Sequence, residues 1–164
     1  MSVFQSELYE QHCRRIYGIC LRIIGNREDA EETMHDVFLK IFDRWNELQD
    51  KQAFVAWSRS IALRTAIDHI RKNKIVFESI DNLSIVEDDE DLYDLPELTV
   101  EDVKTALNAL PEGYRIVVSM RLIEQCEFSE IADLLQIKET SVRSQYIRGK
   151  EKLAKNLKQK YNNI

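Results

Sequence analysis

The chain has 164 residues with a net charge of −6, 44% hydrophobic residues, four glycines and two prolines. This length suits one ordinary domain or two small ones, and the scarcity of glycine and proline favours helices over a turn-rich β fold. No apolar run approaches the about 18 residues of a membrane span, and the first ten residues have neither the basic segment nor the apolar stretch of a signal peptide. We therefore expect an all-α protein of the cytoplasm, without direct insertion into a membrane.

Three amphipathic helices are predicted in the N-terminal part, over residues 6–24, 27–44 and 51–74, because apolar side chains recur there at helical spacing. Gly25 and Asn26 end the first helix, since both tolerate the left-handed C-cap conformation. Trp57 shares the helical phase of Phe54 and Ile61, so we expect it in the core. Three such helices can enclose one core of about 70 residues, and residues 1–74 are assigned to one small domain.

Acidic residues dominate the next stretch. Between Glu78 and Asp102 there are eleven acidic side chains and no lysine or arginine. The apolar residues follow no period and Pro96 interrupts them, so residues 75–98 are predicted to form an acidic flexible linker. Basic segments flank it: residues 59–74 contain five bases and one acid, and residues 138–160 contain eight bases and two acids.

Four helices are predicted in residues 99–164, the second domain. Thr99 and Asp102 resemble a capping box at the start of the first helix. Pro111 fits the start of the next helix, where its missing N–H costs little. Val118 and Leu122 are expected to face inward from that second helix.

The last two predicted helices, within residues 127–153, form a helix-turn-helix pattern. The polar break 136–138 separates the two helices. The second helix is basic on its outer face, and a helix fits into the major groove of DNA, which is about 12 Å wide. Arg143, Arg148 and Lys150 are expected on this outer face. The hydroxyls of the adjacent pair 140–141 can cap the helix or bond a phosphate. The pattern alone leaves an ordinary helical hairpin open as the alternative.

Catalysis and metal binding find no support in the residue pattern. Cys13, Cys20 and Cys126 form no CxxC pair and are expected as reduced, mostly buried thiols. The three histidines are isolated from further ligands at metal-binding spacing. We predict no enzyme activity, no catalytic residue, no metal and no cofactor.

Four segments of the chain resemble one family. They are Asn26–Glu32 running into Asp36–Lys40, Phe54–Trp57 with Ile61–Ala62 and Ile67–Arg71, Ala109–Arg115, and Glu127–Ala132 with Ser141–Ser144 and Arg148–Leu153. In this order they resemble regions 2 and 4 of the extracytoplasmic-function group of bacterial RNA polymerase sigma factors. The chain departs from the usual residues of that group at His35, Ser58, Arg64 and Gly149.

The resemblance implies the partners and the residues that contact them. Core RNA polymerase and promoter DNA would be the partners, with an external anti-sigma factor. The residues implied for core polymerase are Asp29, Glu32, Asp36, Leu39 and Lys40; those for the melted −10 strand are Arg59, Arg64, Arg71 and Lys72; those for the −35 duplex are Thr140, Ser141, Arg143, Ser144, Ile147, Arg148 and Lys150.

A different class of protein also fits the C-terminal half. A stand-alone helix-turn-helix regulator would bind DNA as a dimer without polymerase. That alternative leaves the acidic helix 27–44 and the basic third helix without a role.

Overall fold

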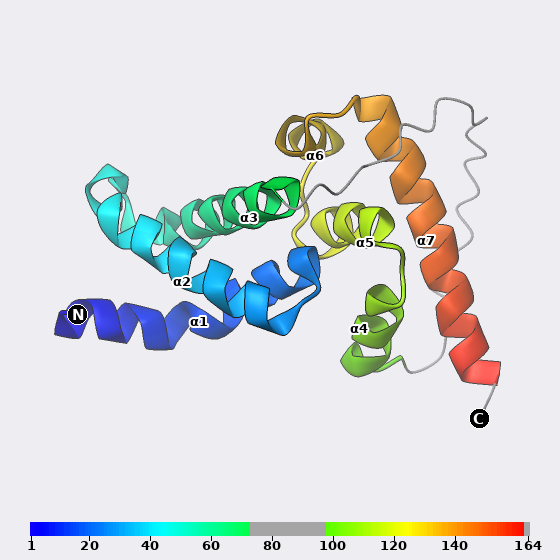
Figure 1. Cartoon of the computed structure of the whole chain (residues 1–164), viewed down its shortest axis with the longest axis horizontal. Helices are drawn as coiled ribbons and strands as arrows, with labels where there is room; N and C mark the ends of the chain where they lie inside the picture. The colour runs from blue at the N-terminus through cyan, green and yellow to red at the C-terminus, as the bar shows by residue number, and fades with distance from the viewer. Residues whose placement is uncertain (73–97, 163–164) are drawn as a thin grey trace. The chain divides into compact units, whose positions relative to one another are not determined.

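The computed structural model describes residues 1–72 and 98–162, the last three of these by their backbone only. Within these ranges all regular elements are helices, which confirms the predicted all-α fold (Figure 1). The chain divides into two compact units, residues 1–75 and 76–164. The predicted linker, 75–98, lies outside the described residues except for Leu98, so its limits and its flexibility stay predictions.

The N-terminal unit contains the three predicted helices: α1 (Val3–Ile24), α2 (Arg27–Asp43) and α3 (Phe54–Lys72). The 3₁₀ turns η1 (Trp45–Glu47) and η2 (Lys51–Ala53) connect α2 to α3. Each helix packs on the other two (Figure 1). The shared core is aliphatic on all three sides, with Ile16, Ile19 and Ile23 from α1, Val37 and Ile41 from α2, and Leu63, Ile67 and Ile70 from α3.

Local signals explain where these helices begin and end. The Ser2 side chain accepts from the Gln5 backbone and the Gln5 side chain accepts from the Ser2 backbone, so a capping box starts α1 three residues before the predicted position. Gly25 ends α1 in the left-handed conformation, as predicted, and Asn26 caps α2 by accepting from the Asp29 N–H.

The described part of the C-terminal unit, residues 98–162, contains four α-helices: α4 (Val100–Asn108), α5 (Glu112–Val118), α6 (Phe128–Leu135) and α7 (Glu139–Asn162). One turn of π-helix, η4 (Ser119–Ile123), extends α5. A reciprocal cap between Thr99 and Asp102 starts α4, as predicted. Along α7, two leucines join the apolar faces of α4 and α5 in a core of Ala106, Leu107, Leu110, Val118, Leu153 and Leu157.

Two expectations about this unit are wrong. Leu122 does not face inward: its side chain is 41% exposed, because the π-helical turn breaks the period on which the prediction relied. Helix α7 begins at Glu139, so Thr140 and Ser141 lie inside its first turn and do not occupy the N-cap position.

Candidate functional site

The five residues predicted to bind core polymerase occupy one face of α2, since their spacings of three, four and seven residues keep them together. Glu32, Asp36, Leu39 and Lys40 are exposed and Asp29 is half-exposed. Leu39 is 65% exposed and lies beside Asp36 and Lys40 on this face. The face therefore combines negative charge with one apolar contact point.

Two members of that face also connect α2 to α3. The Lys40 ammonium donates to the Thr65 hydroxyl at 3.1 Å, and Thr65 donates to the Ile61 carbonyl at 2.7 Å. Asp29 Oδ2 lies 3.6 Å from His69 Nε2. Lys40 and Asp29 thus contribute to packing within the unit, whereas Glu32, Asp36 and Leu39 lie on its outer surface.

The basic residues of α3 do not share a single face. Arg64 and Arg71 lie seven residues apart and so on one side of the helix, with Lys72 beside them; Arg64 and Lys72 are exposed. Arg59 is half-buried and lies five residues before Arg64, about 140° away around the helix. A strand of nucleic acid along the Arg64–Arg71 side would meet Lys72 more readily than Arg59.

An aromatic cluster surrounds the turns between α2 and α3, and sequence reasoning found only part of it. Trp45 contacts Phe4 edge-on at 4.9 Å between centroids, and it lies 5.8 Å from Phe54 and 6.5 Å from Trp57. Trp57 is half-buried, so its expected place in the core is wrong in part. Its ring packs in this cluster, which extends from buried Phe54 to exposed Phe4 and which no helical period predicts, because Trp45 lies in a 3₁₀ turn.

The turn that contains Trp45 is fixed by an ion pair. Arg44 donates through Nε and Nη2 to one oxygen of Glu47, at 2.9 and 2.7 Å. The hydrogen bond from Arg44 lowers the pKa of the Glu47 carboxyl. Both side chains are well exposed, so we treat the pair as a local restraint on η1 rather than as a source of stability.

Helices α6 and α7 form the predicted helix-turn-helix. Gln136 ends α6 with φ 55° and ψ 44°, and the Ile137 N–H donates to the Ala132 carbonyl at 3.2 Å. The backbone N–H groups of Ser141 and Val142 both donate to the Lys138 carbonyl, at 3.0 and 3.1 Å. A left-handed glutamine takes the place of the glycine that such a turn often has.

Most of the predicted −35 residues lie on the outer side of α7. Thr140, Arg143, Ile147 and Lys150 form a stripe, with Ser144 at its edge, and Thr140 and Arg143 are exposed. The Ser144 hydroxyl donates to the Thr140 carbonyl at 3.0 Å.

Two predicted members lie apart from this stripe. Ser141 is 6% exposed, so its side chain points into the unit, and we leave it out of the candidate interface. Arg148 is half-buried and lies about 140° around the helix from Arg143.

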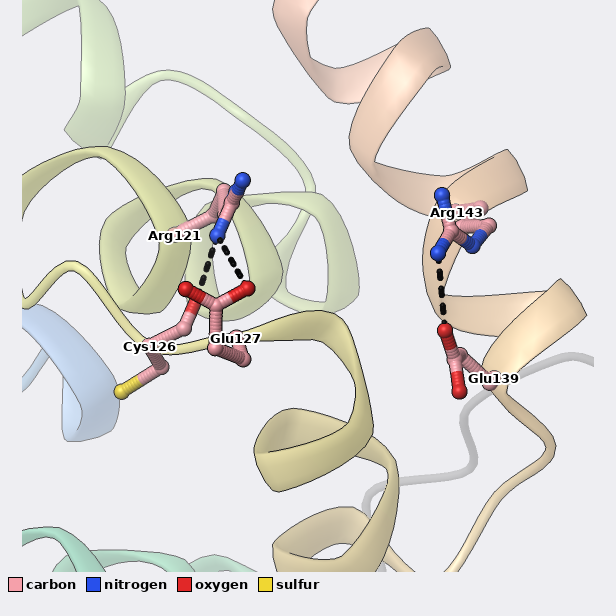
Figure 2. A network of polar contacts seen from close by, with 5 residues as sticks. All are labelled: Arg121, Cys126, Glu127, Glu139 and Arg143. Carbon is pink, nitrogen blue, oxygen red and sulfur yellow. Dashed lines mark hydrogen bonds and ion pairs between the residues drawn. The ribbon is translucent and has the colours of Figure 1, made fainter.

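Sequence reasoning missed two side chains that contact Arg143, namely Glu139 and Phe128, of which Figure 2 draws Glu139. Arg143 Nη2 donates to Glu139 Oε1 at 2.8 Å, and its guanidinium carbon lies 4.6 Å from the centroid of the Phe128 ring. The guanidinium of Arg121 lies 4.5 Å from the same centroid. The i,i+4 spacing of Glu139 and Arg143 was readable in the sequence, whereas the approach of Phe128 depends on the turn.

Other kinds of site are not evident. Residues 1–72 and 98–162 bring no three histidine, cysteine or acidic side chains into an arrangement that could hold a metal ion. In the same part of the chain no helix has the length and apolar character required to cross a bilayer. Cys20 and Cys126 are buried and Cys13 is half-buried, all three as free thiols.

Comparison with known proteins agrees with this two-unit arrangement. The family model for Sigma-70 region 2 matches residues 8–75, and the model for Sigma-70, region 4 matches residues 101–153. The ECF RNA polymerase sigma factor SigE of Mycolicibacterium smegmatis is 30% identical over 153 residues, which cover 90% of this chain and 59% of that protein. The chain belongs to the extracytoplasmic-function sigma factors.

Further relatives cover more of their own length. The ECF RNA polymerase sigma factor SigW of Bacillus subtilis is 26% identical over 156 residues, which cover 88% of this sigma factor and 83% of SigW. Among solved structures, the sigma factor RpoE of Bartonella quintana, in complex with the anti-sigma factor NepR, matches with a TM-score of 0.58. That match has 16% identity and covers 93% of this chain and 96% of the other, so it supports the fold.

Proposed function

We propose that this sigma factor directs core RNA polymerase to promoters and helps to open them. The observation that carries the proposal is the order of the two units: a three-helix unit matched by region 2 is followed by a helix-turn-helix unit matched by region 4. The stand-alone dimeric regulator is not favoured. The match to Sigma-70 region 2 gives the N-terminal unit a role, whereas a stand-alone regulator leaves that unit unexplained.

The acidic face of α2 is the proposed docking surface for core polymerase. Glu32 and Asp36 provide charge for a basic partner, and Leu39 supplies an apolar contact that excludes water. Asp29 and Lys40 are assigned a supporting part in this surface, since their contacts with His69 and Thr65 hold α2 against α3.

The Arg64–Arg71 side of α3, with Lys72, is the proposed path of the −10 strand, and Arg59 is assigned to its margin. Cationic side chains follow phosphates, and a melted base gains stacking energy on an aromatic side chain, on the order of 1–3 kcal/mol per base. Opening a base pair costs a few kcal/mol, a similar magnitude. Contacts of the basic side chains with the phosphates must therefore supply additional binding energy to keep the strands open.

Helix α7 is the proposed reader of the −35 duplex. Its outer stripe of Thr140, Arg143, Ile147 and Lys150 would face the major groove, and Ser144 and Arg148 would contact the backbone at its edges. A single arginine that binds guanine through two hydrogen bonds discriminates by about 1–3 kcal/mol against a wrong base.

The proposal implies no catalytic residue, metal or cofactor in this chain, because the polymerase would perform the chemistry. It places the chain in the cytoplasm with the polymerase and the chromosome. An anti-sigma factor is proposed as a further partner, by similarity to the RpoE complex.

Run-off transcription with purified core polymerase on genomic promoter fragments tests the proposal, together with a measurement of core affinity. Asp36→Lys should weaken core binding roughly tenfold, or about 1.4 kcal/mol, by placing a like charge in the docking surface. Glu31→Lys is the matched control, since Glu31 is exposed on another side of α2. Failure of the unmodified chain to bind core polymerase would refute the proposal, and equal effects of the two variants would refute the surface.

A further inference from the structure

Phe128, the first residue of α6, contacts two arginines from different elements. The guanidinium carbon of Arg121, from η4, lies 4.5 Å from the ring centroid, and that of Arg143, from α7, lies 4.6 Å away. Both distances are within the about 6 Å over which a cation is attracted to an aromatic ring. None of the promoter contacts proposed above involves Phe128.

The ring is held in place from two sides. Tyr146 of α7 packs edge-on against it at 5.3 Å between centroids. Arg121 donates to the carbonyl of buried Cys126 at 3.0 Å and lies 3.4 Å from Glu127 Oε2 (Figure 2). Because Cys126 is fully buried, this bond ties Arg121 to the interior of the unit. Phe128 is therefore a fixed platform beside the start of α7.

Glu139 restrains Arg143 from a second direction. It is the first residue of α7, where the helix dipole favours an acid, and its carboxylate accepts from Arg143 Nη2 at 2.8 Å. In a helix-turn-helix the N-terminal residues of the second helix contact base edges. An acceptor on DNA that binds Arg143 through the same Nη2 N–H has to replace Glu139, and the carboxylate itself repels phosphates.

We propose that Phe128 and Glu139 are positioning residues that make Arg143 discriminate among bases. The contact with the Phe128 ring holds the guanidinium of Arg143 in place while Glu139 occupies one of its N–H groups. The remaining N–H groups can donate to guanine, which offers two acceptors, O6 and N7. Glu139 disfavours single contacts between Arg143 and a phosphate, because its carboxylate repels the phosphate charge. The inference rests on the proposed role of α7 in −35 recognition.

Selection from a duplex library tests this inference with the holoenzyme, formed from core polymerase and the full chain. The library carries a randomised block at the −35 position, and sequencing of bound duplexes gives the preference at each base pair. Arg143→Ala should abolish the preference at one position or two adjacent ones. Phe128→Leu should reduce the preference there by about two- to fivefold, the range of an exposed cation–π contact, and Phe128→Tyr should retain it.

Glu139→Gln provides an independent variant that leaves Phe128 in place. We expect it to raise affinity for random duplex about two- to fivefold and to lower the preference at the Arg143 position, because the competing carboxylate is gone. Far-UV circular dichroism of each variant reports on folding. A merely structural role for Phe128 would weaken all positions equally.

A double-mutant cycle separates this inference from the proposed function. In an Arg143→Ala background, Phe128→Leu and Glu139→Gln should have no further effect on the base preference. Suppose that the holoenzyme selects a motif. If Phe128→Leu then changes the base preference at no single base pair, or changes it by the same factor in the Arg143→Ala background, the positioning role is refuted. If no holoenzyme forms, the proposed function itself fails.

Discussion

One helix in each unit ends in the left-handed backbone conformation, but the two use different residues. Gly25 ends α1 with φ 78°, and Gln136 ends α6 with φ 55°. Glycine adopts this conformation without steric cost, whereas a residue with a Cβ loses about 1–2 kcal/mol. Gly25 by itself therefore favours the end of α1. At the end of α6, the packing of the helices on either side holds Gln136 in the left-handed conformation.

The same contrast extends to the candidate functional residues. In the N-terminal unit, Glu32, Asp36 and Arg64 are exposed positions on long helices, and their side chains follow the helical period. In the C-terminal unit, the surroundings of Arg143 depend on a π-helical turn, on left-handed Gln125 and on left-handed Gln136. The orientation of side chains in the C-terminal unit thus depends on the turns between its helices. Substitutions at such turns and at close helix contacts should therefore affect the two units differently.

The largest expected difference concerns two glycines within helices, Gly149 in α7 and Gly18 in α1. A Cβ on Gly149 would lie 2.6 Å from Val118 Cγ2 and 3.1 Å from Tyr114 Cβ, so Gly149→Ala forces α7 away from α5. We expect a loss of about 1–2 kcal/mol in the free energy of unfolding of the C-terminal unit, because overpacking outweighs the better helix propensity of alanine.

Gly18→Ala in α1 is the matched control. Its Cβ would meet only the end of the Arg22 side chain, at 3.2 Å, which is flexible enough to move. This variant should gain about 0.5–1 kcal/mol from helix propensity. Both tryptophans lie in the N-terminal unit, so tryptophan fluorescence follows that unit during denaturation, and hydrogen exchange in α5 and α7 follows the other. A neutral Gly149→Ala would contradict the close approach of α7 to α5.

Exchange of the two helix-end residues comes next in size. Gly25→Gln should destabilise the N-terminal unit by about 1–2 kcal/mol, and Gln136→Gly should stabilise the C-terminal unit by about 0.5–1 kcal/mol, because each changes the cost of the left-handed conformation. Urea unfolding with the same two probes measures both. Destabilisation by Gln136→Gly would mean that the glutamine side chain makes contacts worth more than the backbone strain.

Sequence patterns predicted the helices of the first unit but not its aromatic cluster around Trp45, and they were insufficient for parts of the second unit. Helical spacing predicted α1, α2 and α3, and the Thr99–Asp102 cap predicted the start of α4. The outward turn of Leu122 was missed because a single π-helical turn has no sequence signature. The contact of Phe128 with Arg143 was missed because residues fifteen positions apart meet only through the geometry of the intervening turn.

The smallest expected effect is a pH dependence confined to the N-terminal unit. Burial and the nearby Arg15 lower the pKa of His12, whose ring lies 4.7 Å from the Phe54 centroid. Between that lowered value and the ordinary value near 6.5, the unfolded chain binds more protons than the folded chain, so stability must fall as pH falls. From about pH 7.5 to about pH 5.5, the unmodified chain should therefore lose stability relative to His12→Gln, as followed by tryptophan fluorescence in urea. The other two histidines are common to both proteins and cancel in the difference; a difference independent of pH would show that His12 contributes through packing alone.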